Sequence, residues 1–389
     1  EDSENMLLEQ PLPVVYTIIE GIDVVNEGDS ANYVVKLQDA AGNPVIATQD
    51  TIIYVRYTNK TTQDGDTQYN NENIIEVVIK AGTSQTEFTI KTNDDYLADN
   101  GEIYNVAITG NNSTEFDMRT GDVAGNKTNV DTTILDNTTI NPNEDSNVES
   151  DMEQVVLKIV AADQNGKPIK DVNGEYLTVN EVPEGDTAYY VVLAFEPNTT
   201  KFNDNTKLDI QSGTVEVKTF DKDATGTTTQ TKEDGTQDYV SKTQKVELGK
   251  VISVETLDDW KADNSEQYEI KITDKSYEHP TTGAVYENVV TNTDPVTTTI
   301  KDNTTDKPNN PSTIENNQEN VILKIVAVGE NGEPIIKDGK YTFANEVAEG
   351  SNAKYMVLAF KPDTTEFKVT DKLDIQSGTV EVKTFDKDA

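Results

Sequence analysis

Apolar and polar residues alternate along most of the chain in short runs, which Gly, Asn, Asp and Pro separate. Such alternation places every second side chain on one face and predicts half-buried β-strands. In the first part of the chain these runs cover residues 15–19, 33–37, 52–57, 74–79, 87–91, 103–109 and 132–135. They are rich in Val, Ile, Tyr and Thr and show no helical stripe, so we expect an all-β chain whose first domain is an antiparallel β-sandwich.

The strand pattern occurs again further along the chain. A second series of strands opens at residues 155–160 and a third at residues 321–327. Residues 372–389 are identical in sequence to residues 207–224. Repeats of this length are whole domains in tandem, because the turns of a solenoid are much shorter.

Polar stretches that contain Pro and Asn separate the repeats and are too poor in apolar residues to form a core. We expect tandem sandwiches joined by short polar linkers, with the last domain incomplete. The boundaries are a tail at 1–13, domain one at 14–139, a linker at 140–154, domain two at 155–305, a linker at 306–320 and a partial domain three at 321–389. Domain three lacks counterparts of the strands from Val246 onward, so we interpret the chain as a fragment of a longer array. We expect this unit to be the least stable.

The composition excludes several classes of function. The formal net charge is -39, which costs stability through self-repulsion unless cations neutralise part of it. The same sign argues against nucleic acid and anionic lipid as partners. The chain has no Cys, and a single histidine, His279, excludes His-clustered zinc or iron sites and makes a Ser-His-Asp triad a poor interpretation. No apolar run approaches the ~20 residues that span a bilayer, so we expect no membrane insertion.

Carboxylates recur at four equivalent places in the first two domains. An acidic loop lies before a strand in each, with the sequence Asp-Asp-Tyr-Leu-Ala-Asp-Asn-Gly-Glu at 94–102 and Asp-Asp-Trp-Lys-Ala-Asp-Asn-Ser-Glu at 258–266. A Glu-Gly-Asp triplet precedes an early strand at 27–29 and 184–186. Single Asp residues follow in mid-domain, at 66 and 238, and at the end of the last strand, at 136 and 302.

The four acidic positions, in this order, resemble the pattern of the Calx-beta domains of sodium–calcium exchangers and of many bacterial surface proteins. The resemblance covers essentially all of domains one and two and implies immunoglobulin-like sandwiches whose marks converge at one end and bind calcium. Three departures leave the number of ions open. Asp66 is separated from Tyr69, where the family has Asp-Tyr, both domains end in Asp-Asn and not in a run of Asp, and both are longer than is usual in the family.

Carried over position by position, the resemblance implies seven calcium ligands in each of the two domains. They are Glu27, Asp66, Asp94, Asp95, Asp99, Glu102 and Asp136 in domain one, and Glu184, Asp238, Asp258, Asp259, Asp263, Glu266 and Asp302 in domain two. Such oxygen ligands suit Ca2+, whereas Mg2+ prefers fewer carboxylates and retains its waters. The alternative is that the loops are solvated turns of a very acidic protein. In domain three Ser351 replaces the Asp of the triplet, and we expect little or no calcium binding there.

Three functions fit these patterns, and none is enzymatic, because the acids cluster by loop without the aromatic or amide residues that line a sugar site. The first is an extender region of a secreted, repetitive bacterial adhesin on the cell surface, rigidified by Ca2+. Its partners are neighbouring repeats of the same chain, and a host or surface ligand binds elsewhere. The second is a multivalent glycan- or protein-binding module that uses the insertion at 165–181 and its counterpart at 331–346. The third is a surface-layer or filament subunit. The amino terminus has no signal-peptide pattern, so secretion would use another signal, or the chain is an internal fragment.

Overall fold

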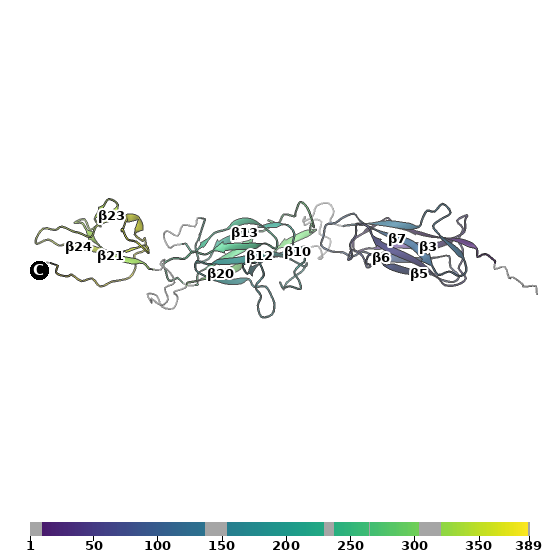
Figure 1. Ribbon diagram of the computed structural model, residues 1–389, viewed down its shortest axis with the longest axis horizontal. Helices are drawn as coiled ribbons and strands as arrows, with labels where there is room; N and C mark the ends of the chain where they lie inside the picture. The colour runs from purple at the N-terminus through teal and green to yellow at the C-terminus, as the bar shows by residue number, and fades with distance from the viewer. Residues whose placement is uncertain (1–9, 137–153, 229–236, 264, 303–319, 388–389) are drawn as a thin grey trace, which may run out of the picture. The chain divides into compact units, whose positions relative to one another are not determined.

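The computed structural model describes residues 10–136, 154–228, 237–263, 265–302 and 320–387, which form two compact units. Unit one contains residues 1–156, 195–200 and 279–290, and unit two contains residues 157–194, 201–278 and 291–389. The regular elements of the described residues are β-strands and one 3-10 turn, η4 (Val369–Asp371) (Figure 1). Within these ranges no helix is long and apolar enough to cross a membrane. Most of the predicted tail and linkers, at 1–9, 140–153 and 306–319, lies outside the described residues.

The first domain is a sandwich of two sheets. One sheet has the strand order β6 (Gln85–Lys91), β3 (Ser30–Gln38), β1 (Val14–Gly21) and β8 (Asp117–Thr120). The other has the order β2 (Val24–Asn26), β9 (Asn129–Leu135), β7 (Glu102–Asn111), β4 (Thr51–Asn59) and β5 (Ile74–Ile79). All seven predicted runs form strands, and the structure adds the short edge strands β2 and β8.

Neighbouring strands of this sandwich are antiparallel except at two edges, where β8 runs parallel to β1 and β2 runs parallel to β9. The chain leaves one sheet at the end of β1 and enters the other at β2. Gly21 lies at this crossing, where a Cβ atom would lie 2.2 Å from Cδ1 of Tyr33. Only glycine allows the backbone to pass so close to the tyrosine ring.

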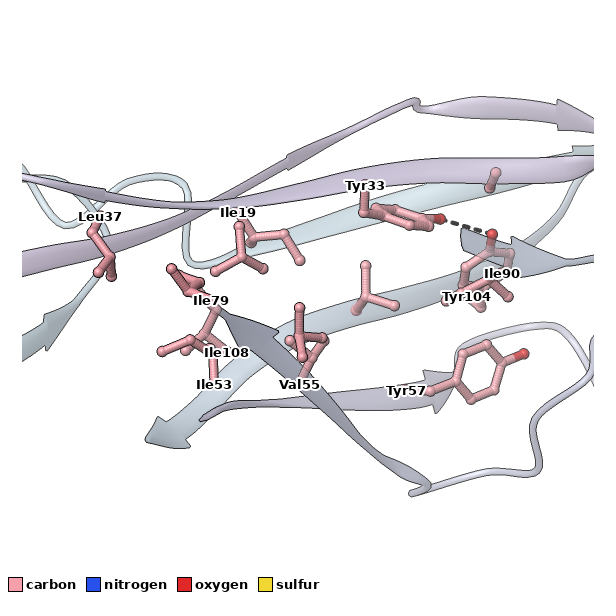
Figure 2. Close-up of a cluster of buried hydrophobic side chains, with 14 of the residues drawn as sticks. Ile19, Tyr33, Leu37, Ile53, Val55, Tyr57, Ile79, Ile90, Tyr104 and Ile108 are labelled. Atoms are coloured by element: carbon pink, nitrogen blue, oxygen red, sulfur yellow. Dashed lines mark hydrogen bonds between the residues drawn. The ribbon is translucent and has the colours of Figure 1, made fainter. Parts of the chain in front are cut away.

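Alternate side chains of both sheets form the core of the first sandwich. Val35 and Leu37 of β3 face Val55 of β4 and Val106 of β7, and all four are at most 1% exposed. The hydroxyl of Tyr33 joins the two sheets, because it lies 2.7 Å from the hydroxyl of Tyr104 (Figure 2). It also lies 2.6 Å from Oγ1 of Thr132. Burial of these three polar groups is offset by the hydrogen bonds among them.

The second domain repeats this plan with longer connections. One sheet has the order β17 (Val251–Glu255), β12 (Thr187–Phe195), β10 (Gln154–Ala162) and β19 (Asn288–Thr291). The other has the order β11 (Val179–Pro183), β20 (Val296–Lys301), β18 (Gln267–Ile272), β13 (Thr214–Asp221) and β16 (Thr243–Glu247), and a short pair joins β14 (Gly226–Thr227) to β15 (Tyr239–Val240). The tyrosine bridge recurs, since the hydroxyl of Tyr190 contacts the hydroxyl of Tyr268, at 2.8 Å, and Oγ1 of Thr298. Tandem β-sandwiches are therefore the fold of the chain.

The insertion after β10 is tied to the body of the second sandwich. Ile169 donates its N–H to the carbonyl of Ala161, and Ala161 donates to the carbonyl of Leu177, each at 2.9 Å. Tyr176 is 6% exposed, and its hydroxyl donates to Asp204 at 2.6 Å. These contacts attach the insertion to the end of β10.

The third unit contains few strands. Antiparallel β21 (Ile322–Val328) and β24 (Lys354–Phe360) form one pair, and β22 (Ile336–Lys337) and β23 (Lys340–Tyr341) form another. Its buried apolar cluster consists of Val326, Tyr341, Leu358 and Phe360. Residues 377–386 form no strand, although the same sequence forms β13 in the second domain.

Candidate metal centre

The Glu-Gly-Asp triplet of the first sandwich brings its glutamate to the acidic loop. Gly28 has a φ of 77°, a conformation that favours glycine, and a Cβ atom there would lie 3.4 Å from Cβ of Asp94. This tight turn directs Glu27 toward the loop, where its Oε1 accepts the N–H of Asp95 at 3.1 Å. The triplet therefore anchors the start of the loop between β6 and β7.

Pairing of β2 with β9 brings the closing aspartate to the same place. Glu27 follows β2 and donates its N–H to the carbonyl of Leu135 at 2.9 Å, so that Asp136 is its neighbour. Asp136 is 4% exposed, and its N–H donates to Oδ1 of Asn100 at 3.2 Å. One carboxylate oxygen from each of Glu27, Asp99 and Asp136 lies within 4.8 Å of the other two.

These carboxylates line a hollow at this end of the sandwich. Its walls are formed by Glu27, Asp66, Asn93, Asp95, Asp99, Asn100, Glu102, Ile134 and Asp136. Asp66 contacts Glu102 through their carboxyl groups, and Asp94 lies close enough to raise the pKa of Glu27. The structure thus gathers all seven predicted ligand residues of the first domain.

The first cluster favours protonated carboxyls in the absence of a cation. Burial, followed by the charges of Asp95 and Asp99, raises the pKa of Glu27 to about 9. Burial and the contact with Asp66 raise the pKa of Glu102 to about 8, and burial with the charge of Asp95 raises the pKa of Asp99 to about 7. A bound divalent cation would relieve the same repulsion.

The second sandwich reproduces this geometry. Glu184 accepts the N–H of Asp259 on Oε1 at 2.8 Å and donates its own N–H to the carbonyl of Lys301 at 2.9 Å, which places it beside Asp302. Gly185 has a φ of 80°, and a Cβ atom there would lie 3.1 Å from Cβ of Asp258. The triplet, the loop and the closing aspartate therefore meet as in the first sandwich.

The mid-domain aspartate completes the second cluster. Carboxylate oxygens of Asp238, Asp259 and Asp263 lie within 4.8 Å of one another, and Asp238 contacts Glu266. Burial raises the pKa of Glu184 to about 9, of Glu266 to about 8 and of Asp259 to about 7, and neighbouring carboxylates add to each shift. All seven predicted ligand residues of the second domain are thus also neighbours.

Several residues of the two clusters escaped the sequence analysis. Asn93 and Asn100 line the first hollow and offer amide oxygens. Lys261 lies inside the second cluster, where its Nζ is 3.2 Å from Oδ2 of Asp263. Comparison of the two acidic loops shows the signal, because Lys261 replaces Leu97 while the flanking Asp residues are unchanged.

The first acidic loop has a further contact within unit one. Ala98 donates its N–H to the carbonyl of Val285 at 2.8 Å, and Glu287 donates to the carbonyl of Tyr96 at 3.0 Å. The rings of Tyr96 and Tyr286 meet edge to face, with centroids 6.2 Å apart. Residues 285–287 therefore add a short bridge to the outer side of the loop.

The chemistry of both clusters fits a hard divalent cation. Their donors are carboxylate and amide oxygens, and the chain has no thiolate and no second imidazole to attract a transition metal. Among the described residues, the groups of three carboxylates with suitable spacing are those of the two sandwiches. In the third unit Glu349 and Ser351 are exposed, and little or no calcium binding there stays a prediction.

No protein-family model matches the chain, and no curated protein sequence matches it. Solved structures do match. The apo form of the Calx CBD1 domain is 13% identical, covers 31% of this chain and 96% of that chain, and has a TM-score of 0.24. The calcium-binding domain CBD12 of CALX1.1 is 12% identical and has a TM-score of 0.26. The match covers 74% of this chain and 99% of that chain. A metal-bound CARDB domain of Pyrococcus furiosus is 13% identical and has a TM-score of 0.19. The match covers 33% of this chain and 96% of that chain. Likenesses at these scores carry no argument about what this chain binds, so the function is argued from its own residues.

Proposed function

We propose that the chain is a stretch of extender domains from a large, secreted bacterial adhesin, and that Ca2+ bound to the acidic cluster of each sandwich rigidifies it. The observation that supports this most is the gathering of seven carboxylates at the same place in two successive sandwiches. A solvated turn does not require four separate segments of a domain to direct acids toward one point. Clusters built twice in the same way favour a bound cation.

The mechanism is electrostatic. Without a cation the carboxylates repel one another or retain protons, as the raised pKa values of Glu27 and Glu184 indicate. With Ca2+ they coordinate one or more ions, so that the triplet, the loop and the end of the last strand are held together. Since Asp136 and Asp302 lie four residues before the first residues of the predicted linkers, an ion also fixes the exit of the chain from each sandwich.

Two features support an extender over a direct binding module. The insertion considered as a binding surface is tied to the second sandwich through Ile169, Ala161 and Tyr176. The large negative charge is spread over repeated domains, and not gathered at one recognition site. A repeated, cation-dependent sandwich suits a spacer that holds another part of a protein away from a surface.

Thermal unfolding of the full chain tests the calcium sites. We expect the unfolding temperature to rise strongly when excess Ca2+ replaces a chelator, and to rise much less in Mg2+. Asp258→Ala with Asp259→Ala should remove the part of the rise that belongs to the second sandwich. The matched control, Asp209→Ala with Glu247→Ala, removes two exposed acids outside the predicted set. Equal curves in chelator and Ca2+ would refute the proposal.

Small-angle scattering tests the extender. If Ca2+ fixes the chain ends of each sandwich, the distribution of molecular dimensions should narrow when Ca2+ replaces the chelator. The variant with Asp136→Ala and Asp302→Ala should stay broad in Ca2+. A wild-type chain that gives identical scattering in both conditions would leave calcium binding standing and contradict the mechanical role.

A further inference from the structure

The two acidic loops begin with the same hydrogen-bonded turn, but they differ in charge at one position of that turn. Leu97 donates its N–H to Oδ1 of Asp95, and Lys261 donates its N–H to Oδ1 of Asp259, each at 2.6 Å. The turn is therefore conserved between the two sandwiches of this chain. At its apex an apolar side chain in the first loop is replaced by an ammonium group in the second.

The ammonium group of Lys261 points into the second cluster. Its Nζ lies 3.2 Å from Oδ2 of Asp263, and the two side chains are only 29% and 30% exposed. Asp263 shares the group of mutually close carboxylates with Asp238 and Asp259. A lysine ammonium group is charged at neutral pH, so Lys261 places a positive charge beside these carboxylates.

We infer that Lys261 is a built-in cation of the second cluster, which holds Asp263 when no Ca2+ is bound and is displaced when Ca2+ binds. This inference rests on the proposed calcium sites. It makes the two sandwiches unequal. The second cluster keeps part of its structure without an ion but binds Ca2+ more weakly. The first cluster, whose described lining residues include no Lys or Arg, depends on Ca2+ entirely.

The expected difference follows from the charge that a Ca2+ ion encounters. Seven carboxylates surround each site. In the second site Lys261 already neutralises one unit of their negative charge at short range. A unit charge a few ångströms away, at the effective dielectric constant of a partly buried site, changes affinity by about tenfold or more. An array with such unequal sites would stiffen in two steps as the calcium concentration rises.

Trp260 offers a selective reporter for the test. It is the single tryptophan of the chain, and it lies next to Lys261 in the second acidic loop. When the full chain is titrated with CaCl2, the fluorescence of Trp260 therefore reports calcium binding at the second cluster. The variant with Tyr96→Trp and Trp260→Tyr moves the reporter to the equivalent position of the first loop. Calorimetric titration counts all sites in parallel, whatever the fluorescence does.

We expect the second loop to respond at about tenfold higher calcium than the first. Lys261→Met should move the Trp260 midpoint to lower calcium by a similar factor and lower the unfolding temperature in chelator. Lys261→Arg, which keeps the charge, should preserve both. Lys245→Met is the matched control, because it removes an equal charge from an exposed ion pair with Glu278.

The outcomes separate the inference from the calcium sites. If Lys261→Met leaves the calcium response and the chelator stability unchanged while Asp258→Ala with Asp259→Ala abolishes the response, the lysine is an ordinary surface residue and the inference is wrong. Equal midpoints of the two loops would also overturn it. If calorimetry detects no calcium binding by the wild-type chain, the proposed function fails and the inference fails with it.

Discussion

Raising the pH should destabilise the cation-free protein. Eight cluster carboxyls have raised pKa values, of which those of Glu27 and Glu184 are the highest, at about 9. The folded state therefore binds more protons than the unfolded state at any pH between the ordinary value, 4.5, and the raised one. Unfolding then releases protons, so stability is greatest near the ordinary pKa and is lost as the pH rises through the raised pKa.

The size of the loss follows from these shifts. One pKa unit corresponds to about 1.4 kcal/mol. Glu27 and Glu184 are half-buried, so solvent screening reduces the full value, and we expect a loss of about 2 kcal/mol per cluster between pH 5 and pH 9. Carboxyls in exposed ion pairs, such as Glu20 and Asp131, have lowered pKa values and change charge below this range. They do not mask the effect.

Urea unfolding in a chelator at a series of pH values is the assay. Glu27→Gln with Glu184→Gln should flatten the profile, because glutamine keeps an oxygen that accepts the N–H of Asp95 or Asp259 but cannot ionise. Glu278→Gln, in an exposed ion pair, should leave the profile unchanged. Excess Ca2+ should also remove the loss at high pH. A stability that stays constant or rises from pH 5 to pH 9 in chelator would refute the reasoning.

Two further predictions concern the framework that positions the clusters. Gly21→Ala would place a Cβ atom 2.2 Å from the ring of Tyr33, so we expect a loss of about 1–3 kcal/mol in urea unfolding, whereas Gly110→Ala, with its nearest neighbour at 3.7 Å, should cost much less. Tyr33→Phe removes the hydroxyl that links Tyr104 and Thr132, so we expect the free energy of unfolding to fall by about 1–2 kcal/mol. Tyr16→Phe is the control, because Tyr16 is half-exposed. A Tyr33→Phe variant as stable as the wild-type chain would show that the bridge does not stabilise the sandwich.

The alternation of side chains was enough to predict the main strands, because each of them packs one face into a core. Leu37, Val55 and Val106 are buried as that pattern requires. The edge strands β2 and β8 escaped prediction, since they are short and their polar residues give no clear period. Their parallel pairing depends on the crossing at Gly21, which no local pattern reveals.

Residues 377–386 show how far local sequence can be overridden. In the second domain the same sequence forms β13, where Val215 and Val217 are fully buried between β16 and β18. In the third unit the equivalent Val380 and Val382 are 48% and 62% exposed and belong to no strand. The strand requires neighbours to hydrogen-bond and pack against, and its own propensity does not suffice.

The site residues were predictable in identity but not in environment. The repeated marks at Glu27, Asp95 and Asp136 could be found by comparing the two domains, and the structure places them together. Burial, which raises the pKa of Glu27, could not be inferred from a sequence in which nearly every loop is acidic. The position of Lys261 within the second cluster likewise required the backbone of the loop, because only that backbone turns the side chain toward Asp263.

Direct measurement of bound calcium tests the central claim most simply. Equilibrium dialysis of the full chain against buffered Ca2+ should find ions bound to the wild-type protein even in excess Mg2+. The variant with Asp94→Ala, Asp95→Ala, Asp258→Ala and Asp259→Ala should bind almost none while its strands, measured by circular dichroism, remain. A wild-type chain that binds no more calcium than this variant would show that the acidic clusters are not metal sites.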